Sequence, residues 1–192
     1  MYIPGHFEVT DSDEIFAFVA ANAFGQLISK VDGRFFSTHI PFLLSADRTK
    51  LLGHMARPNP QHLELDNQQV LVTFQGPHDY ISPAWYASPG VPTWNYQAVH
   101  IYGLCKVFDE PEQLKAVVES LTTTYESSFD TPWLPDYRPA MLNVIIGFEI
   151  SIEETQCKFK LNQNRSAQDR ERVAVQLEKL GSHRLAQAMR KI

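Results

Sequence analysis

Aromatic side chains are concentrated in residues 76–100, GPHDYISPAWYASPGVPTWNYQAVH, where prolines and polar groups lie between them. Because proline fixes its own φ, such a segment can hold rings at set positions without a regular element around it. The run therefore predicts a site for a planar ligand. An equally weighted alternative is a surface loop whose rings fill a dimer interface or cap the core. In a strand starting at Thr93, alternation separates amide from aromatic groups. One face carries Thr93, Asn95, Gln97 and Val99, and the other carries Trp94, Tyr96, Ala98 and His100.

Two cationic segments are candidates for holding a phosphate. In HMARPNP, residues 54–60, Arg57 follows an expected strand and precedes an expected short helix, where a guanidinium and free backbone N–H groups favour an anion. In KFKLNQNRS, residues 158–166, two lysines project from one side of a strand before a polar turn. Each segment also has an ordinary explanation, a solvated charge at a strand end or the polar start of a soluble helix.

Other chemistries find little support in the sequence. The seven histidines are scattered without a metal-ligand spacing, so no metal site is predicted. The chain has no GxGxxG, GxxxxGK[ST] or GxSxG motif. Cys105 and Cys157 lie in apolar contexts and are expected to be inert buried thiols.

The elements that must position these segments follow from periodicity and turn signals. Helices are expected over 11–23, 61–66 and 112–125, and the last has one apolar face, formed by Leu114, Val117, Val118, Leu121 and Tyr125. Two more helices are expected on either side of Gly181. The first has a capping pattern at Ser166 and Asp169 and an apolar face of Val173, Leu177 and Leu180, and Ser182 is a candidate cap for the second. Strands are expected over 26–31, 34–44, 50–55, 69–75, 93–107, 144–152 and 156–161, with a tight hairpin at Asp32-Gly33. This order predicts a mainly β, α+β fold, an antiparallel barrel with helices packed on it.

Length and composition predict one globular domain with an appendage. The 192 residues, 44% hydrophobic and 20% charged, suit a β domain over 1–161 and a helical C-terminal extension over 162–192. The first residues do not resemble a signal peptide, and no apolar run is long enough for a membrane helix. With two isolated cysteines, a reducing cytoplasm is the expected location.

Charge is distributed unevenly along the chain. Residues 158–192 hold nine basic and three acidic side chains, whereas residues 1–157 hold eight basic and nineteen acidic ones. A basic end can serve nucleic acid, a phosphate-bearing ligand or the acidic surface of a partner subunit.

Taken in order, several segments resemble one known family over nearly the whole chain. They are FGQLIS, HIPFLL, GHMARPNPQ, HDYISPAWY followed by VPTWNYQAVHIYG, and KFKLNQNRS. Together they resemble the PaiB-type family of FMN-binding negative transcriptional regulators. The resemblance implies a split antiparallel β-barrel of the FMN-binding type, with flanking helices and a homodimer that carries the flavin at the subunit interface.

The resemblance also implies a set of flavin contacts. GHMARPNP would place His54, Met55 and Arg57 near the flavin and its phosphate. VPTWNY would place Trp94, Asn95 and Tyr96 beside the ring system. KLNQNR would offer Lys160, Gln163 and Arg165.

The sequence is compatible with a regulator and with an enzyme, because proteins with this barrel include oxidases, reductases and regulators. No catalytic constellation is identified, so a PaiB-type regulator or binding protein ranks first and an FMN-dependent oxidoreductase second. The two C-terminal helices could form a helix-turn-helix, but the second is short, and a helical cap on the barrel or dimer is favoured. Any DNA contact would have to use the basic C-terminal segment.

Overall fold

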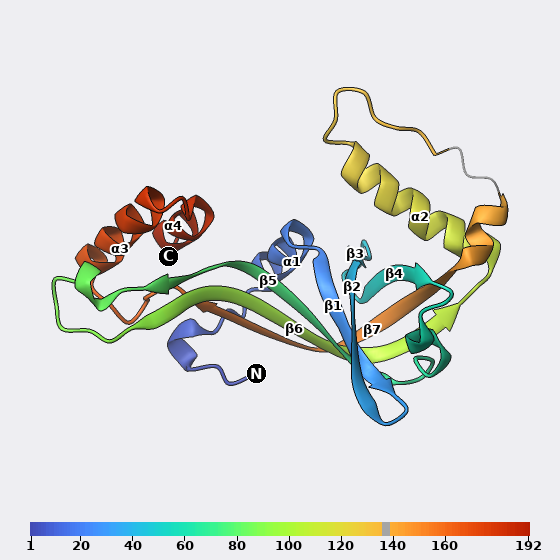
Figure 1. Cartoon of the computed structure of the whole chain (residues 1–192), viewed down its shortest axis with the longest axis horizontal. Coiled ribbons are helices and arrows are strands. Elements are labelled where there is room, and N and C mark those ends of the chain that lie inside the picture. Colours follow the sequence, from blue (N-terminus) through green and yellow to red (C-terminus); the bar gives the residue numbers. More distant parts are fainter. Residues whose placement is uncertain (136–138) are drawn as a thin grey trace. The chain divides into compact units, whose positions relative to one another are not determined.

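The computed structural model describes residues 1–135 and 139–192, and in them seven strands form one mostly antiparallel sheet (Figure 1). The strands are β1 (Phe24–Val31), β2 (Arg34–Pro41), β3 (Leu43–Leu44), β4 (Lys50–Ala56), β5 (Gln69–Ile81), β6 (Thr93–Phe108) and β7 (Ile145–Lys160). Their order across the sheet is β2-β1-β5-β6-β7-β4-β3, so β2 and β3 are the edges. The predicted mainly β fold with flanking helices is confirmed.

Helices and short 3-10 turns connect the strands. The helices are α1 (Ser12–Ala21), α2 (Pro111–Glu126), α3 (Ala167–Lys179) and α4 (His183–Arg190). The 3-10 turns are Gly5–Phe7, Pro60–Leu63, Pro83–Trp85 and Pro139–Val144. Among the described residues every helix is too short or too polar to span a bilayer.

Local signals located most elements correctly, and the differences lie in strand length and in the helix expected over 61–66, which is a 3-10 turn over Pro60–Leu63. Asp32 and Gly33 have φ of 50° and 71°, the two positive values that the predicted hairpin turn requires. The strand expected over 69–75 continues to Ile81, and the two strands expected over 144–152 and 156–161 are one strand, β7. The expected strand over 34–44 is divided into β2 and β3. Pairing with the long neighbour β6 compensates for the unfavourable local residues in β5 and β7.

The chain divides into two compact units, which we call the terminal unit and the central unit. The terminal unit contains residues 1–18, 74–100 and 156–192, and the central unit contains residues 19–73 and 101–155. The predicted division at residue 161 stays a prediction.

The central unit has an apolar core and one buried polar cluster. Leu27, Leu51, Ile101, Phe148 and Ile150 are inaccessible to water. Gln61, also fully buried, donates from Nε2 to the carbonyl oxygen of Leu27 (3.1 Å) and to Ser29 Oγ (2.9 Å). α2 buries Leu114, Val117 and Leu121 as its period predicts, whereas Tyr125, expected on the same face, is 46% exposed.

In the terminal unit, α3 and α4 bury the apolar residues of their inner faces and lie together (Figure 1). Ser166 caps α3 by accepting from the N–H of Asp169 (3.1 Å), and Gly181 follows α3 with φ of 86°, as expected. Two expectations are wrong. Leu180 is 67% exposed because it lies beyond the end of α3, and Ser182 makes no side-chain cap to α4.

A close backbone approach between β6 and β7 in the central unit generates a stability prediction. A Cβ at Gly103 would overlap the carbonyl oxygen of Ser151, and backbone cannot move aside as a flexible side chain can. We expect Gly103→Ala to lower the free energy of unfolding by about 1–3 kcal/mol, measured by urea denaturation. Gly5→Ala is the control, because a Cβ there meets nothing within 4 Å. Equal stability of the two variants would show that the strands separate freely at this point.

Candidate functional site

The nine residues predicted to contact flavin fall into two groups, one in each unit. The terminal unit contains Trp94, Asn95, Tyr96, Lys160, Gln163 and Arg165, and the central unit contains His54, Met55 and Arg57. The structure brings several members of the first group together and gives others a structural task.

One face of β5, β6 and β7 in the terminal unit carries rings and cations, and we call it the aromatic–lysine face. Its members are Tyr2, His78, Tyr80, Trp94, Tyr96, Lys158 and Lys160. The Trp94 ring is 54% exposed, and its centroid lies 6.2 Å from that of Tyr80 in an edge-to-face arrangement and 6.5 Å from that of His78. Such a group of rings presents both faces and edges to a planar ligand.

The two lysines of this face lie among aromatic rings and carbonyl oxygens. Lys158 Nζ is 5.4 Å from the ring centroid of Tyr96 and donates to the carbonyl oxygen of Tyr2 (3.1 Å). Lys160 Nζ donates to the carbonyl oxygen of Trp94 (2.7 Å) and to Thr93 Oγ1. Burial lowers the pKa of Lys160, and the neighbouring charge of Lys158 lowers it further. Among the described residues neither lysine has a carboxylate partner, so the pair favours an anion.

The side chains of Asn95 and Gln163 make hydrogen bonds within the protein and do not lie on the aromatic–lysine face. The predicted alternation along β6 is confirmed, and it directs Asn95 away from Trp94 and Tyr96 into the core, where it is fully buried. Its Nδ2 donates to Met189 Sδ (3.4 Å), while its Oδ1 has no hydrogen-bond partner among residues 1–135 and 139–192. Gln163 accepts from the N–H of Leu161 (2.7 Å) and stabilises the turn after β7.

Arg165 and Asp169 hold the loop between β5 and β6. The Arg165 guanidinium lies 4.5 Å from the ring centroid of Tyr86 and donates to the carbonyl oxygen of Pro89 (2.9 Å). Asp169 accepts from Ser88 Oγ and from the N–H of Ala87, both at 2.6 Å. The hydrogen bond from Ser88 has the largest effect on the pKa of Asp169, and both bonds lower it. The sequence marked Asp169 only as part of a capping pattern, because its contacts with the loop are remote in sequence.

The central group is divided between core and surface. Met55 is a core residue with 4% of its surface exposed. His54 is half-buried with no partner for Nδ1, and burial lowers its pKa. Arg57 donates from Nε to the carbonyl oxygen of Asn143 (2.8 Å), and its Nη1 lies 3.7 Å from Asp109. Much of its donor capacity is therefore used within the protein.

Cys105 and Cys157 are buried, as expected, and are not part of this chemistry. Burial raises the pKa of each thiol to about 12. Because the thiolate is the reactive form, neither cysteine suits a nucleophilic role near neutral pH.

Comparison with known proteins gives one family and several structural relatives. Residues 1–154 match the family described as "Putative FMN-binding domain". Protease synthase and sporulation protein PAI 2 of Bacillus subtilis is 40% identical over 186 residues, 93% of this chain and 89% of its own.

Solved structures show the same fold at low sequence identity. An FAD and heme binding protein from Mycobacterium smegmatis has a TM-score of 0.67 at 12% identity, covering 85% of this chain and 78% of its own. The flavocytochrome Anf3 from Azotobacter vinelandii has a TM-score of 0.62 at 16% identity, covering 80% and 69%.

Proposed function

Because this chain belongs to the PaiB-type family of FMN-binding domains, we propose that it is a homodimeric, cytoplasmic FMN protein that acts as a negative transcriptional regulator. FMN is the cofactor that this family membership assigns to it. The observation that carries the proposal is the aromatic–lysine face, which combines exposed rings with two cations that have no carboxylate partner.

The residues of this face fit the two parts of FMN. A planar ring system is matched by Trp94 and Tyr80, and a phosphate is matched by Lys158 and Lys160. When bound, FMN supplies the electron-transfer chemistry of its flavin ring. His54, Met55 and Arg57 stay proposed as flavin contacts on the family resemblance, and Arg57 is the weaker phosphate candidate because carbonyl groups and Asp109 already engage it.

Exposed apolar surface supports the homodimer. In the central unit, Ile28, Leu71 and Tyr102 line one side of β1, β5 and β6, together with Phe35, whose side chain is 83% exposed. This apolar patch is small, and polar side chains of the same hollow surround it, among them Lys30, Glu64 and Gln68. An apolar centre with a polar rim is the usual composition of a protein interface. In the proposed homodimer, a second copy of the chain covers this patch.

The basic C-terminal segment supports at most a small DNA contact. Arg190 bonds Glu171 and Glu178, and Arg165 is engaged by Tyr86 and Pro89. The cations that remain exposed with no ion pair in the described residues are Arg172, Lys179 and Lys191.

The first test is FMN affinity, followed by flavin fluorescence during titration. We expect Lys160→Met to weaken FMN binding by about 1.5–3 kcal/mol, roughly 10-fold to 150-fold, because a charge-assisted bond to phosphate is lost. Riboflavin has no phosphate, so its affinity should not change. Lys115→Met is the control, since Lys115 lies on α2 in the central unit, outside the predicted flavin contacts and outside the proposed dimer surface. Unchanged FMN affinity in Lys160→Met together with a large loss in Arg57→Ala would move the phosphate to Arg57.

The second test is oligomeric state, measured by sedimentation velocity. Phe35→Glu should convert the dimer to a monomer, because it places a charge in the exposed apolar patch without touching the core. Leu63→Glu, at a side chain 74% exposed and outside the patch, should leave the dimer intact. A Phe35→Glu dimer as tight as the parent would exclude this surface as the interface.

The third test addresses DNA, by mobility shift with the DNA upstream of the protein's own gene. Three phosphate contacts per protomer predict a log–log salt slope of about −3 per protomer, and replacing Arg172, Lys179 and Lys191 with Gln should abolish the shift. Replacing Arg48, Lys50 and Lys115 with Gln removes the same charge from the central unit, outside the proposed dimer surface, as a control. No shift by the parent protein at low salt would refute direct DNA binding and leave the flavin proposal standing.

A further inference from the structure

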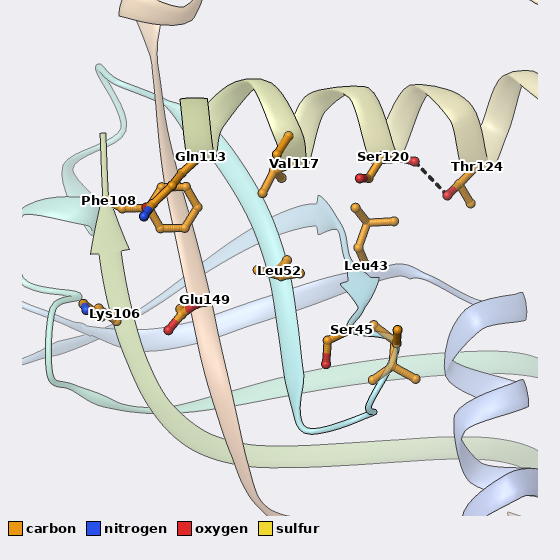
Figure 2. A pocket seen from close by; sticks show the side chains of 13 residues that line it. Leu43, Ser45, Leu52, Lys106, Phe108, Gln113, Val117, Ser120, Thr124 and Glu149 are labelled. Atoms are coloured by element: carbon orange, nitrogen blue, oxygen red, sulfur yellow. Dashed lines mark hydrogen bonds between the residues drawn. The ribbon is translucent and has the colours of Figure 1, made fainter. Parts of the chain in front are cut away.

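A cavity of about 640 Å³ lies in the central unit between α2 and the face formed by β3, β4, β6 and β7. Figure 2 shows Val117 and Ser120 of α2 directed toward Leu43 and Leu52 across this space, with Phe108 at one end. The Phe108 ring covers Gly147, where a Cβ would overlap it, so this wall depends on a glycine. The cavity includes none of the predicted flavin contacts.

The charges at the cavity do not cancel. Glu149 is paired with Lys50, whose Nζ lies 3.0 Å from its carboxylate oxygen. Lys106 lines the same end of the cavity, and in the described part of the chain no carboxylate lies within 4 Å of its Nζ. The three side chains together leave one positive charge, and Gln113 contributes an amide to the same lining.

The rest of the lining is mostly apolar. Leu43, Leu44, Leu52, Phe108, Ala116 and Val117 form the walls. A space of this volume with apolar walls and a few polar groups has the dimensions of a small-molecule site. A ligand that complements it needs an apolar body and one negative charge.

We propose that this cavity binds a small amphipathic monocarboxylate, with its carboxylate at Lys106 and Gln113 and its hydrocarbon or aromatic body between α2 and β4. This site is independent of the proposed FMN function. The cavity lining has one lysine, Lys106, whereas the aromatic–lysine face has two, Lys158 and Lys160, for a phosphate.

The experiment is calorimetric titration of the full chain with octanoate and with 1-octanol. Octanoate should bind to a single site per chain, and 1-octanol, which has the same body without the charge, at least tenfold more weakly. Lys106→Met should reduce octanoate affinity at least tenfold and leave 1-octanol affinity unchanged. Lys115→Met, on α2 outside the cavity, is the matched control and should bind octanoate like the parent.

A blocking variant tests the location. Ser120→Trp fills the cavity from an exposed helix position and should abolish octanoate binding, while Thr123→Trp, also exposed on α2 but outside the lining, should not. Equal affinity for octanoate and 1-octanol, or unchanged octanoate binding in Lys106→Met or Ser120→Trp, would overturn the proposal. Displacement of octanoate by FMN would also overturn it, because the cavity would then be the flavin site.

Discussion

Along β6, inward-facing side chains recur at every second position, and Asn95, Val99, Ile101 and Cys105 are inaccessible to water. The constraint is strict, because a shift of one residue in register would turn the whole buried set outward. The same alternation determines which side chains lie on the opposite face of β6. Trp94 and Tyr96 lie on the aromatic–lysine face because Asn95 and Gln97 lie in the core.

The positive charge of residues 158–192 is used largely within the terminal unit. Arg190 joins Glu171 and Glu178, which brings the end of α4 against α3. Lys158 and Lys160 contact rings and carbonyl oxygens instead of carboxylates, so their charge is still available to an anionic ligand. A net charge counted from sequence does not separate these two uses, although only the second supports binding.

In the central unit, polar side chains bond backbone carbonyl oxygens. Arg57 and Gln61 are polar side chains at the end of β4 and just after it, and each bonds backbone carbonyl oxygens that would otherwise need water. Lys106 lies at a cavity, and in the part of the chain that the structure describes no carboxylate pairs with its Nζ. The functional value of a cation here depends on whether the surrounding backbone leaves it without a partner.

The sequence by itself determined the features set by neighbouring residues, namely the Asp32-Gly33 hairpin, the Ser166 cap, the buried face of α2 and the alternation after Thr93. Backbone φ and the two periodicities suffice for these. Only the tertiary structure decided that β7 runs unbroken through Glu153 and Glu154, that Lys160 meets Trp94, and that Asp169 holds the loop at Ala87. The last two contacts join residues 66 and 82 positions apart, so they depend on strand pairing and helix packing, which local propensities do not contain.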